Sequence, residues 1–403
     1  MRVLRLLAVP VVLAAVRPVD AGVIVVSLQP GPGVDYTVLE SALTVATAGD
    51  IVLVRPGVYT PMLFGSGFHV KAGVALVGDV GGEVRLQDRI SIAAVPAAGF
   101  ALVSGMNAEW LTHQGSQGLV LVDRSRLREG ASVTGAASFV MHGSHLDGSE
   151  GVYIGHTFPG GPGLEVSSSN VRIYECFLKG GQAGGDEVYG IYWGGAGLLL
   201  YSGSVVAHAT AFHGGKGADG FCTFSGPYPC YGGGIGGDGI DMPSGSVAWI
   251  GCTATAGPGG DALTSYCGTC PAGPSGLPIY PPGAAASTLP GHACGLIAPR
   301  VLREGQSASF GVKGTQGDLA LLAVGTGPVD IALGALGVLH LASPTLVVLQ
   351  TIPTTEVSQT FTLAELGPGV EGALAWMQAA TIDPQGTVAL GPLAATLLLD
   401  ASL

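Results

Sequence analysis

Alternating apolar residues recur at a constant step of 19 residues in the first half of the chain. The motifs Ala101-x-Val103, Val120-x-Val122 and Phe139-x-Met141 follow this step. Because successive side chains of a strand point to opposite faces, the named residues would face one side of a sheet. A repeat of fixed length is typical of stacked parallel coils. The equivalent positions of this repeat are Met106, Ser125 and Ser144, and also Leu127 and Leu146.

Three longer segments repeat a related pattern further along. Gly163-Leu164, Gly197-Leu198 and Gly239-Ile240 each open a segment of alternating apolar residues. Thirteen residues after each glycine stand Cys176, Thr210 and Cys252. The spacings of 34 and 42 residues exceed one short coil, and the intervening text is rich in Gly, Tyr, Trp, Asp and His. We therefore expect loops that extend from single coils, with a β-sandwich of Gly-rich hairpins as the less economical alternative.

The N-terminal part of this region predicts the entry to the coil. Residues 23–27 indicate a strand, residues 36–48 have helical spacing, and residues 50–59 indicate a second strand. The order Tyr-Thr, helix, Ala-Gly-Asp, apolar strand, Pro-Gly-x-Tyr resembles the entry segment of the pectin-lyase-like superfamily. This resemblance implies a right-handed parallel β-helix over residues 22–270, with a short helix covering its open end.

The composition and the spacing of apolar residues change in the C-terminal part of the chain. Residues 271–298 are rich in Pro, Gly, Ala and Ser, which predicts a linker. Residues 299–403 alternate short apolar runs with turns, and their "LGPG" and "WMQAA" pieces resemble small β-sandwich modules of secreted bacterial proteins. The expected fold class is all-β, with a parallel β-helix followed by a small β-sandwich-like domain. Expected strands in the second part are 307–312, 319–324, 346–350, 359–363, 373–380 and 388–390.

Composition agrees with a packed β-structure. The chain has 68 Gly and 26 Pro in 403 residues, yet 47% of its residues are hydrophobic and only 11% are charged. Disordered chains combine low hydrophobicity with high charge, so the glycines should serve turns and close contacts in a folded chain.

The first 21 residues indicate export. Basic residues 1–5 precede the apolar run 6–16, which is too short to span a bilayer, and cleavage is expected after Ala21. Removal of the three arginines and one aspartate of this segment changes the formal net charge from −12 to −14. We expect a secreted or cell-surface protein without a membrane span in the mature chain. Nucleic acid is excluded as a partner because phosphate contacts need clustered Lys and Arg.

Two carboxylates are candidate catalytic residues. The segments Gly236-Gly237-Asp238-Gly239-Ile240-Asp241 and Gly259-Gly260-Asp261 resemble the paired acidic elements of polygalacturonase-type glycoside hydrolases. The resemblance implies Asp238 and Asp261 as acid and base, with Asp241 beside them. Gly237 and Gly260 replace family residues, and the later Gly-His-Gly and Arg-x-Lys elements are missing from the sequence.

The sequence offers fewer candidate residues for lyase chemistry or metal binding. His213 and Lys216 lie near Asp219, so a lyase-type base is conceivable, but residues 150–298 contain only three Lys or Arg. No cofactor is indicated, and the loop carboxylates leave Ca²⁺ open as a ligand. The aromatic residues that suit sugar stacking are Tyr189, Tyr192, Trp193, Tyr201, Tyr228 and Tyr231.

Seven cysteines in an exported chain predict disulfides. Cys222 and Cys230 bracket a Pro-containing loop and form a natural pair, whereas Cys176 and Cys252 are expected to be inward-facing thiols. Cys267, Cys270 and Cys294 are expected in disulfides rather than in a zinc site with His292.

These observations leave three functional hypotheses. The first is a surface protein that binds a glycan or another surface component through its looped coils. The second is a polysaccharide-degrading hydrolase or lyase, and the third is a purely structural surface protein.

Overall fold

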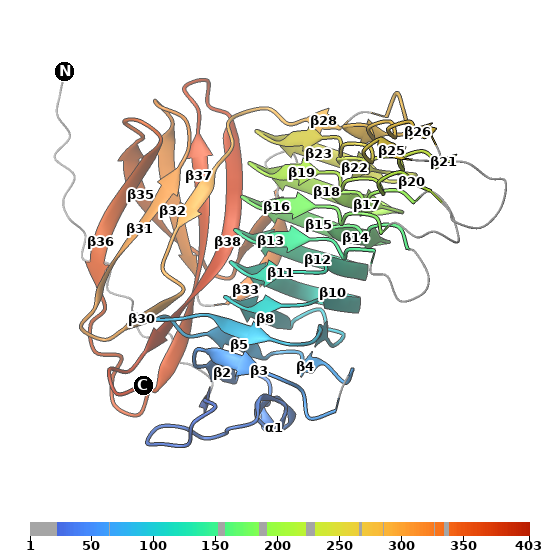
Figure 1. The fold of residues 1–403 in the computed structure, drawn as a ribbon. Helices are drawn as coiled ribbons and strands as arrows, with labels where there is room; N and C mark the ends of the chain where they lie inside the picture. The colour runs from blue at the N-terminus through green and yellow to red at the C-terminus, as the bar shows by residue number, and fades with distance from the viewer. Residues whose placement is uncertain are drawn as a thin grey trace.

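The computed structural model describes residues 22–63, 65–151, 158–184, 192–222, 230–265, 268–284, 286–325, 327–333 and 338–403. Almost all regular structure in these residues is β-strand, as the sequence predicts, and α1 (Leu39–Val45) is the one helix among them. Figure 1 shows two parts side by side, a stack of short parallel strands and a set of longer strands from the C-terminal third of the chain. No helix in the described ranges is long and apolar enough to cross a membrane.

A sixteen-stranded sheet supplies two walls of the stack. Its long strands β10 (Leu111–Asp123) and β12 (Ala131–His142) belong to both walls. The first wall also contains β1 (Val23–Val26), β2 (Ile51–Val54), β5 (Ala75–Gly78), β8 (Phe100–Ser104), β15 (Ser169–Tyr174), β18 (Gly203–His208), β23 (Ser246–Ile250) and β28 (Ser287–Thr288). The second wall contains β4 (Phe68–Val70), β7 (Ile90–Ile92), β14 (Leu164–Ser167), β17 (Leu198–Leu200), β22 (Ile240–Asp241) and β27 (Ile279–Tyr280).

An eight-stranded parallel sheet supplies the third wall. Each of its strands has two or three residues and follows a strand of the first wall in the chain. It contains β3 (Gly57–Tyr59), β6 (Val84–Leu86), β9 (Asn107–Ala108), β11 (Arg126–Leu127), β13 (His145–Asp147), β16 (Phe177–Lys179), β19 (Ala211–His213) and β24 (Thr253–Thr255). Two short hairpins lie outside the walls, β20 (Phe221–Cys222) with β21 (Cys230–Tyr231) and β25 (Leu263–Ser265) with β26 (Gly268–Cys270).

The predicted register of the repeats is confirmed. Val120 pairs with Ala101 on one side and with Phe139 on the other. Leu198 likewise pairs with both Leu164 and Ile240, so the 34- and 42-residue intervals are single coils with long loops. The inward side chains form one continuous core between the three walls. This arrangement is compatible with a β-helix-like solenoid.

The N-terminal end of the core is closed by α1. Leu39, Ala42 and Leu43 are buried and belong to the core of the stack. The helix is shorter than the expected 36–48, and the expected single strand 50–59 is divided into β2 and β3. Pro56 lies between these strands and has no N–H to donate, which favours the break at that position.

One bend between the first and third walls repeats in six coils. Its outward residue has a positive φ in each coil, including Arg124 (φ 44°), Glu175 (φ 52°) and Ala209 (φ 47°). The next residue points inward, and in five of the six coils its hydroxyl or thiol accepts a hydrogen bond from the backbone N–H of the equivalent residue one coil earlier. The donor and acceptor pairs of this ladder are Met106 N to Ser125 Oγ, Ser125 N to Ser144 Oγ, Ser144 N to Cys176 Sγ, Cys176 N to Thr210 Oγ1 and Thr210 N to Cys252 Sγ.

Residues 271–298, expected to form a linker, contain paired strands. β27 pairs with β22, and β28 pairs with β23, so this segment supplies the last coil. β29 (Gly295–Ile297) then pairs with β31 of the C-terminal part. This Pro- and Gly-rich segment therefore contains short strands, which are held by hydrogen bonds to the strands of the preceding coil.

The C-terminal part consists of three antiparallel or mixed sheets. The largest has the order β30-β38-β37-β32-β35, the second has the order β29-β31-β36, and β33 pairs with β34. Their bounds are β30 (Val301–Arg303), β31 (Ser307–Lys313), β32 (Leu319–Gly325), β33 (Pro328–Ala332), β34 (Val338–Leu341), β35 (Thr345–Thr351), β36 (Glu356–Thr362), β37 (Gly372–Ile382) and β38 (Val388–Leu399).

An apolar interface joins the two parts. Outward residues of the first wall, among them Leu53, Leu102 and Leu121, share a buried cluster with Trp376 and Leu397 of the C-terminal part. Trp376 is only 2% exposed, and its ring lies edge-on to Phe100 with 5.2 Å between the ring centroids. Burial of large apolar side chains is the main favourable term in such packing, so the first wall is covered on both faces.

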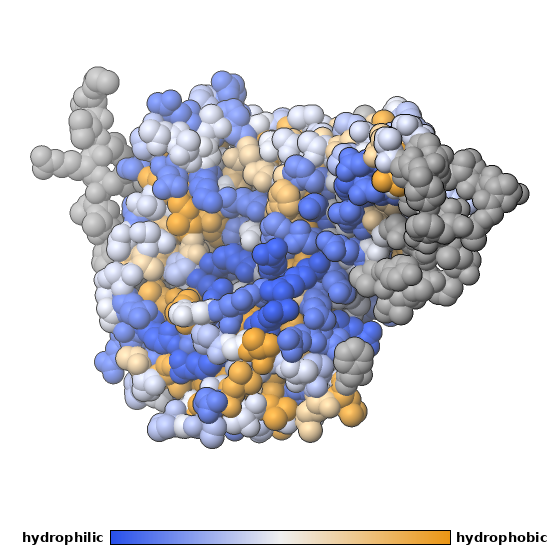
Figure 2. Space-filling model, in the orientation of Figure 1, coloured by the Kyte–Doolittle hydropathy of each residue, from blue (hydrophilic) through white to orange (hydrophobic). Residues whose placement is uncertain are grey.

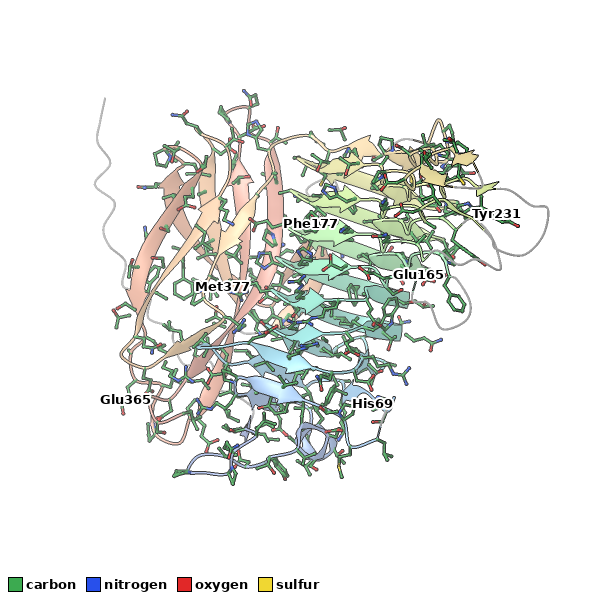
Figure 3. The ribbon with its side chains drawn as sticks, in the orientation of Figure 1. His69, Glu165, Phe177, Tyr231, Glu365 and Met377 are labelled. Atoms are coloured by element: carbon green, nitrogen blue, oxygen red, sulfur yellow. The ribbon has the colours of Figure 1, made fainter. Side chains whose placement is uncertain are left out.

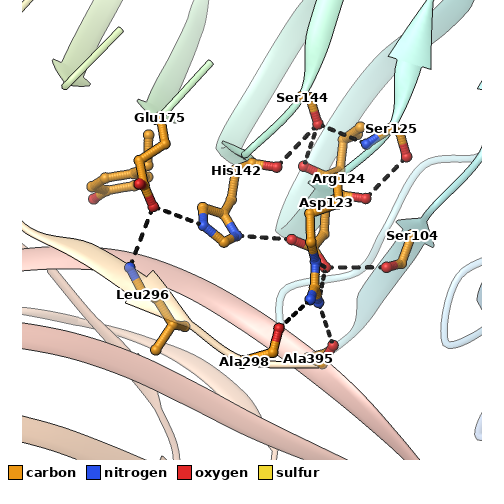
Figure 4. Close-up of polar contacts among 12 residues, drawn as sticks. Ser104, Asp123, Arg124, Ser125, His142, Ser144, Glu175, Leu296, Ala298 and Ala395 are labelled. Carbon is orange, nitrogen blue, oxygen red and sulfur yellow. Dashed lines mark hydrogen bonds and ion pairs between the residues drawn. The ribbon is translucent and has the colours of Figure 1, made fainter. Parts of the chain in front are cut away.

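A chain of charged groups, with Asp123 and His142 buried at its centre, crosses this interface (Figure 4). The guanidinium of Arg124 lies 2.5 Å from the carboxylate of Asp123, which also accepts a 2.8 Å hydrogen bond from His142 Nδ1. His142 Nε2 lies 3.3 Å from Glu175, whose other carboxylate oxygen is 2.7 Å from Lys313 Nζ. Arg124 donates to the carbonyl oxygens of Ala298 and Ala395, and Glu175 accepts from Leu296 N. Asp123, His142 and Glu175 come from three successive coils, so the stack positions them for the C-terminal sheet.

The charges in this chain favour one another's ionised forms. Burial alone would raise the pKa of Asp123, but the charge of Arg124 and the hydrogen bond from His142 lower the pKa to about 2. Burial would also raise the pKa of Glu175, but His142 and Lys313 lower it to about 2. Burial lowers the pKa of His142, yet its hydrogen bonds to Asp123 and Glu175 raise it above its ordinary value. His142 is therefore favoured as a cation between two carboxylates.

Candidate functional site

The loops that leave the coils pack as a bundle of extended glycine-rich segments. We call residues 148–151, 158–163, 180–184, 192–197, 214–220, 232–239, 257–260 and 271–276 the glycine bundle. Backbone hydrogen bonds run through it from Gly161 N to Ser149 O, from Gly181 N to Gly161 O, and from Gly195 N to Gly181 O. The same series continues from Gly215 to Gly195, Gly237 to Gly215, Gly257 to Gly237 and Gly276 to Gly257, all within 2.8–3.1 Å.

The segments of the glycine bundle lie so close together that a side chain larger than that of glycine would overlap neighbouring backbone atoms. A Cβ on Gly195 would lie 1.9 Å from the carbonyl oxygen of Gly161, and a Cβ on Gly237 would lie 1.9 Å from that of Gly195. Neither glycine has a φ in the left-handed region, so the restriction is steric contact with backbone. Extended segments with glycine at every third position, such as Gly214, Gly217 and Gly220, are typical of polyproline II packing.

The bundle carries exposed aromatic side chains. The side chain of Trp193 is 64% exposed. The backbone beside it is held by two hydrogen bonds, since Trp193 O accepts from Gly160 N and Gly194 N donates to Ile235 O. Tyr192 is half-buried, and its carbonyl oxygen accepts from Ala218 N. Tyr231 at the edge of the bundle is exposed (Figure 3). Tyr201 is exposed at the corner between β17 and β18, while Tyr189 and Tyr228 lie outside the described residues.

Lys216 joins two carboxylates on the surface of the bundle. Its Nζ lies 2.7 Å from Asp219 and 2.6 Å from Asp261, and Asp261 N donates to Asp219. The Asp261 side chain is 76% exposed. The side-chain hydrogen bonds to Asp219 and Asp261 raise the pKa of Lys216, which opposes its use as a base near neutral pH. This cluster clamps two adjacent loops together at the surface.

The other predicted catalytic residues have different partners. Asp238 accepts a 2.6 Å hydrogen bond from Leu277 N, and burial raises its pKa. Asp241 Oδ1 has no partner among the described residues, and burial together with the charge of Asp238 raises the pKa of Asp241. Asp238 thus interacts with Asp241 along its own coil, while Asp261 is bound by Lys216.

His213 belongs to an aromatic stack on the outer face of the eight-stranded sheet. Its ring lies 4.8 Å from that of Phe177, which is labelled in Figure 3, and the Phe177 ring lies 4.7 Å from that of His145. Thr255 Oγ1 lies 2.5 Å from His213 Nδ1. Burial and the charge of Lys179 lower the pKa of His213, so it is neutral at physiological pH. In the described ranges no group of three or more His, Cys, Asp or Glu side chains is arranged to hold a metal ion.

The cysteine predictions have mixed outcomes. Cys294 was expected in a disulfide, but it is a buried free thiol in the apolar core of the C-terminal part. That expectation is wrong because the last coil leads Cys294 directly into β29 and its neighbouring sheet. Cys176 and Cys252 are free thiols at equivalent positions, as predicted. Cys222 faces Cys230 in backbone register, so their disulfide stays a prediction; Cys270 is buried, and Cys267 lies outside the described residues.

Thiol labelling can test these assignments. Burial raises the pKa of Cys176 to about 12 and raises that of Cys294 further. Because the thiolate is the reactive species, we expect neither residue to react with iodoacetamide at pH 8 until the protein is denatured. Half-buried Cys252 should react earlier than both and serves as the internal control. Peptide mass spectrometry of the alkylated protein measures this order, and rapid native labelling of Cys176 would contradict the inward register.

Comparisons with known proteins give no family assignment. No protein-family model and no curated protein matches the chain. Among solved structures, a superoxide reductase (neelaredoxin) from Ignicoccus hospitalis shares 11% sequence identity, and the match covers 27% of this chain and 80% of the reductase chain. The TM-score is 0.16, so this likeness carries no argument about fold or function.

Two features of the site were missed from the sequence. The glycine bundle was expected only as loops, although glycines spaced by three residues, as in Gly214-x-x-Gly217-x-x-Gly220, indicate its packing. The charged chain across the interface was missed because the C-terminal sheet that buries it is far away in the sequence. Its residues Asp123 and His142 are nevertheless separated by the 19-residue step, which places them in register.

Proposed function

We propose that this chain is a secreted or cell-surface right-handed parallel β-helix protein that binds a glycan through the aromatic face of its glycine bundle. The observation that carries the proposal is the 64% exposed indole of Trp193, whose carbonyl oxygen accepts from Gly160 N and whose neighbour Gly194 donates to Ile235 O. A ring on backbone that is held in this way loses less conformational entropy on binding. Flat rings with a polar edge suit the apolar faces and hydroxyl groups of sugars.

The geometry supports binding better than cleavage. Glycoside hydrolysis needs an acid and a base placed on either side of one bond. Asp261 is exposed and held by Lys216, whereas Asp238 accepts from Leu277 N one loop away. A ring that holds a loop in place is expected to be buried against that loop, whereas Trp193 is 64% exposed.

Replacement of Trp193 by alanine tests the proposal. We expect Trp193→Ala to weaken binding to the recognised glycan on an array at least about tenfold, which is about 1.4 kcal/mol. Because the side chain is exposed, the free energy of unfolding should change by less than about 0.5 kcal/mol. Leu346→Ala is the matched control, since Leu346 is 58% exposed on β35 and distant from the bundle. Equal glycan binding by the wild type and both variants would refute the proposal.

A further inference from the structure

A hollow of about 360 Å³ lies where the early strands of the eight-stranded sheet meet the C-terminal part. Its wall includes Glu83, Asn107, Arg126 and His145 of that sheet and its flanking turn, Arg124 of the bend, and Arg300 just before β30. Figure 2 shows hydrophilic residues gathered across the middle of the visible face, where Figure 1 has β11 and β13. Charged and polar side chains thus contribute to the lining of the hollow beside the apolar Val84 and Met106, and the hollow lies apart from the glycine bundle.

Most charges around the hollow already have partners. Arg124 is neutralised by Asp123 and donates to two carbonyl oxygens of the C-terminal part. Glu83 accepts from Asn107 Nδ2 and lies 3.5 Å from Arg128. Arg126 lies 3.2 Å from Asp147, but its side chain is 56% exposed, so solvent weakens that pair.

Arg300 is the exception. It forms no ion pair with any described carboxylate, and its Nε is buried without a hydrogen-bond partner in the described part of the chain. The side-chain hydrogen bond described for it joins Nη2 to the carbonyl oxygen of Asp79. Burial and the neighbouring charge of Arg124 lower the pKa of Arg300, although the carboxylates of Asp123 and Asp79 oppose this shift. A half-buried guanidinium without a direct ion pair costs free energy.

The backbone also makes room for this guanidinium. Gly105 lies against Arg300, and a Cβ there would be 2.2 Å from Arg300 Nη1. Arg85 of β6 pairs with Asn107 of β9 in the eight-stranded sheet. The Nε of Arg85, like that of Arg300, is buried without a hydrogen-bond partner among the described atoms. Guanidinium groups present several N–H donors in a plane, which is the geometry that recognises oxyanions.

We propose that the hollow binds the oxyanion of an acidic saccharide, either a carboxylate or a sulfate ester, with Arg300 as its principal ligand. Arg126 supplies a second cation, and His145 and Asn107 also line the hollow. The bound anion would give Arg300 the direct ion pair that no described carboxylate provides. This site is independent of the glycan surface around Trp193.

Titration calorimetry at constant ionic strength tests the site with sodium sulfate, glucuronate and glucose 6-sulfate as probes. We expect the wild type to bind, and we expect Arg300→Gln to bind at least about tenfold more weakly because a charged hydrogen bond is lost. Arg126→Gln should bind severalfold more weakly. Arg89→Gln is the control, because Arg89 contacts Gly65 O near the N-terminal end of the stack, and it should bind as the wild type does.

The probes separate the two sources of the oxyanion. Tighter binding of glucuronate assigns the hollow to a carboxylate, and tighter binding of glucose 6-sulfate assigns it to a sulfate ester. Trp193→Ala should retain the anion affinity, so failure of the glycan proposal and failure of this one are distinguishable. If Arg300→Gln fails to fold, the exposed Arg126→Gln decides the question. No binding by the wild type, or unchanged binding by both arginine variants, would overturn the proposal.

Discussion

Replacement of Gly195 by alanine is expected to lower the free energy of unfolding by at least about 4 kcal/mol. The added Cβ would lie 1.9 Å from the carbonyl oxygen of Gly161 and 2.6 Å from its carbonyl carbon. These are backbone atoms, so neither can turn away as a flexible side chain would. The hydrogen bonds from Gly195 N to Gly181 O and from Gly215 N to Gly195 O would have to break or shift together. Urea denaturation followed by circular dichroism measures the loss.

Gly31→Ala is the matched control for this substitution. Gly31 has no neighbouring atom within 4 Å of the added Cβ, and its φ is outside the left-handed region. This variant should be as stable as the wild type or slightly more stable, because alanine restricts the unfolded chain. If Gly195→Ala and Gly31→Ala unfold at the same urea concentration, then the bundle is not packed backbone against backbone.

The second large effect is expected from the charged chain at the interface. Asp123→Asn should lower the free energy of unfolding by about 3 kcal/mol, because it removes the carboxylate that pairs with Arg124 and leaves Glu175 as the one remaining carboxylate beside His142 among the described residues. Asp147→Asn is the matched control, since Asp147 pairs with Arg126 and His145 at the surface. Its loss should cost less than about 1 kcal/mol. Equal effects of the two substitutions would show that the interface chain is not buried in solution.

The same chain predicts how stability depends on pH. The pKa of Asp123 falls from 3.8 to about 2 on folding, and that of Glu175 falls from 4.5 to about 2. Their stabilising contribution is therefore complete above those unfolded values and is lost as the pH falls toward 2. The pKa of His142 is raised above 6.5, so its contribution is complete below pH 6.5 and is lost as the pH rises through the folded value. Urea titrations from pH 3 to 9 should show a maximum between about pH 5 and 6.5, which Asp123→Asn should flatten.

The stack could be predicted from the sequence because each coil places an apolar residue at the same inward position, so these residues recur at a fixed spacing along the chain. Ala101, Val120 and Phe139 could be aligned from spacing alone, and they pair in that register. The last coil could not be predicted in this way, because residues 271–290 contain few residues that favour strands. Their backbone groups pair with β22 and β23, which already define the edge to which they add.

The sequence identified several residues of the candidate site, but it did not predict which of them contact one another. Trp193 was identified as a candidate sugar-stacking residue, and its exposure is compatible with that role. The surroundings of Asp261 depend on Lys216, which lies 45 residues away on a different loop, and no local pattern indicates that contact. Arg300 was missed because its surroundings, in which its Nε is buried without a partner among the described residues, form only when the two parts of the fold meet.

The cluster that joins the two parts also has a consequence for folding during synthesis. Val25 of β1 and Leu53 of β2 share a buried cluster with Leu397 and Leu399 of β38, which is synthesised long after them. Until β38 arrives, the outer apolar face of the first wall has no cover. Contacts between residues so distant in sequence form slowly, and uncovered strands are prone to aggregate. A nascent chain truncated before β38 should therefore depend on chaperones far more than the full-length protein does.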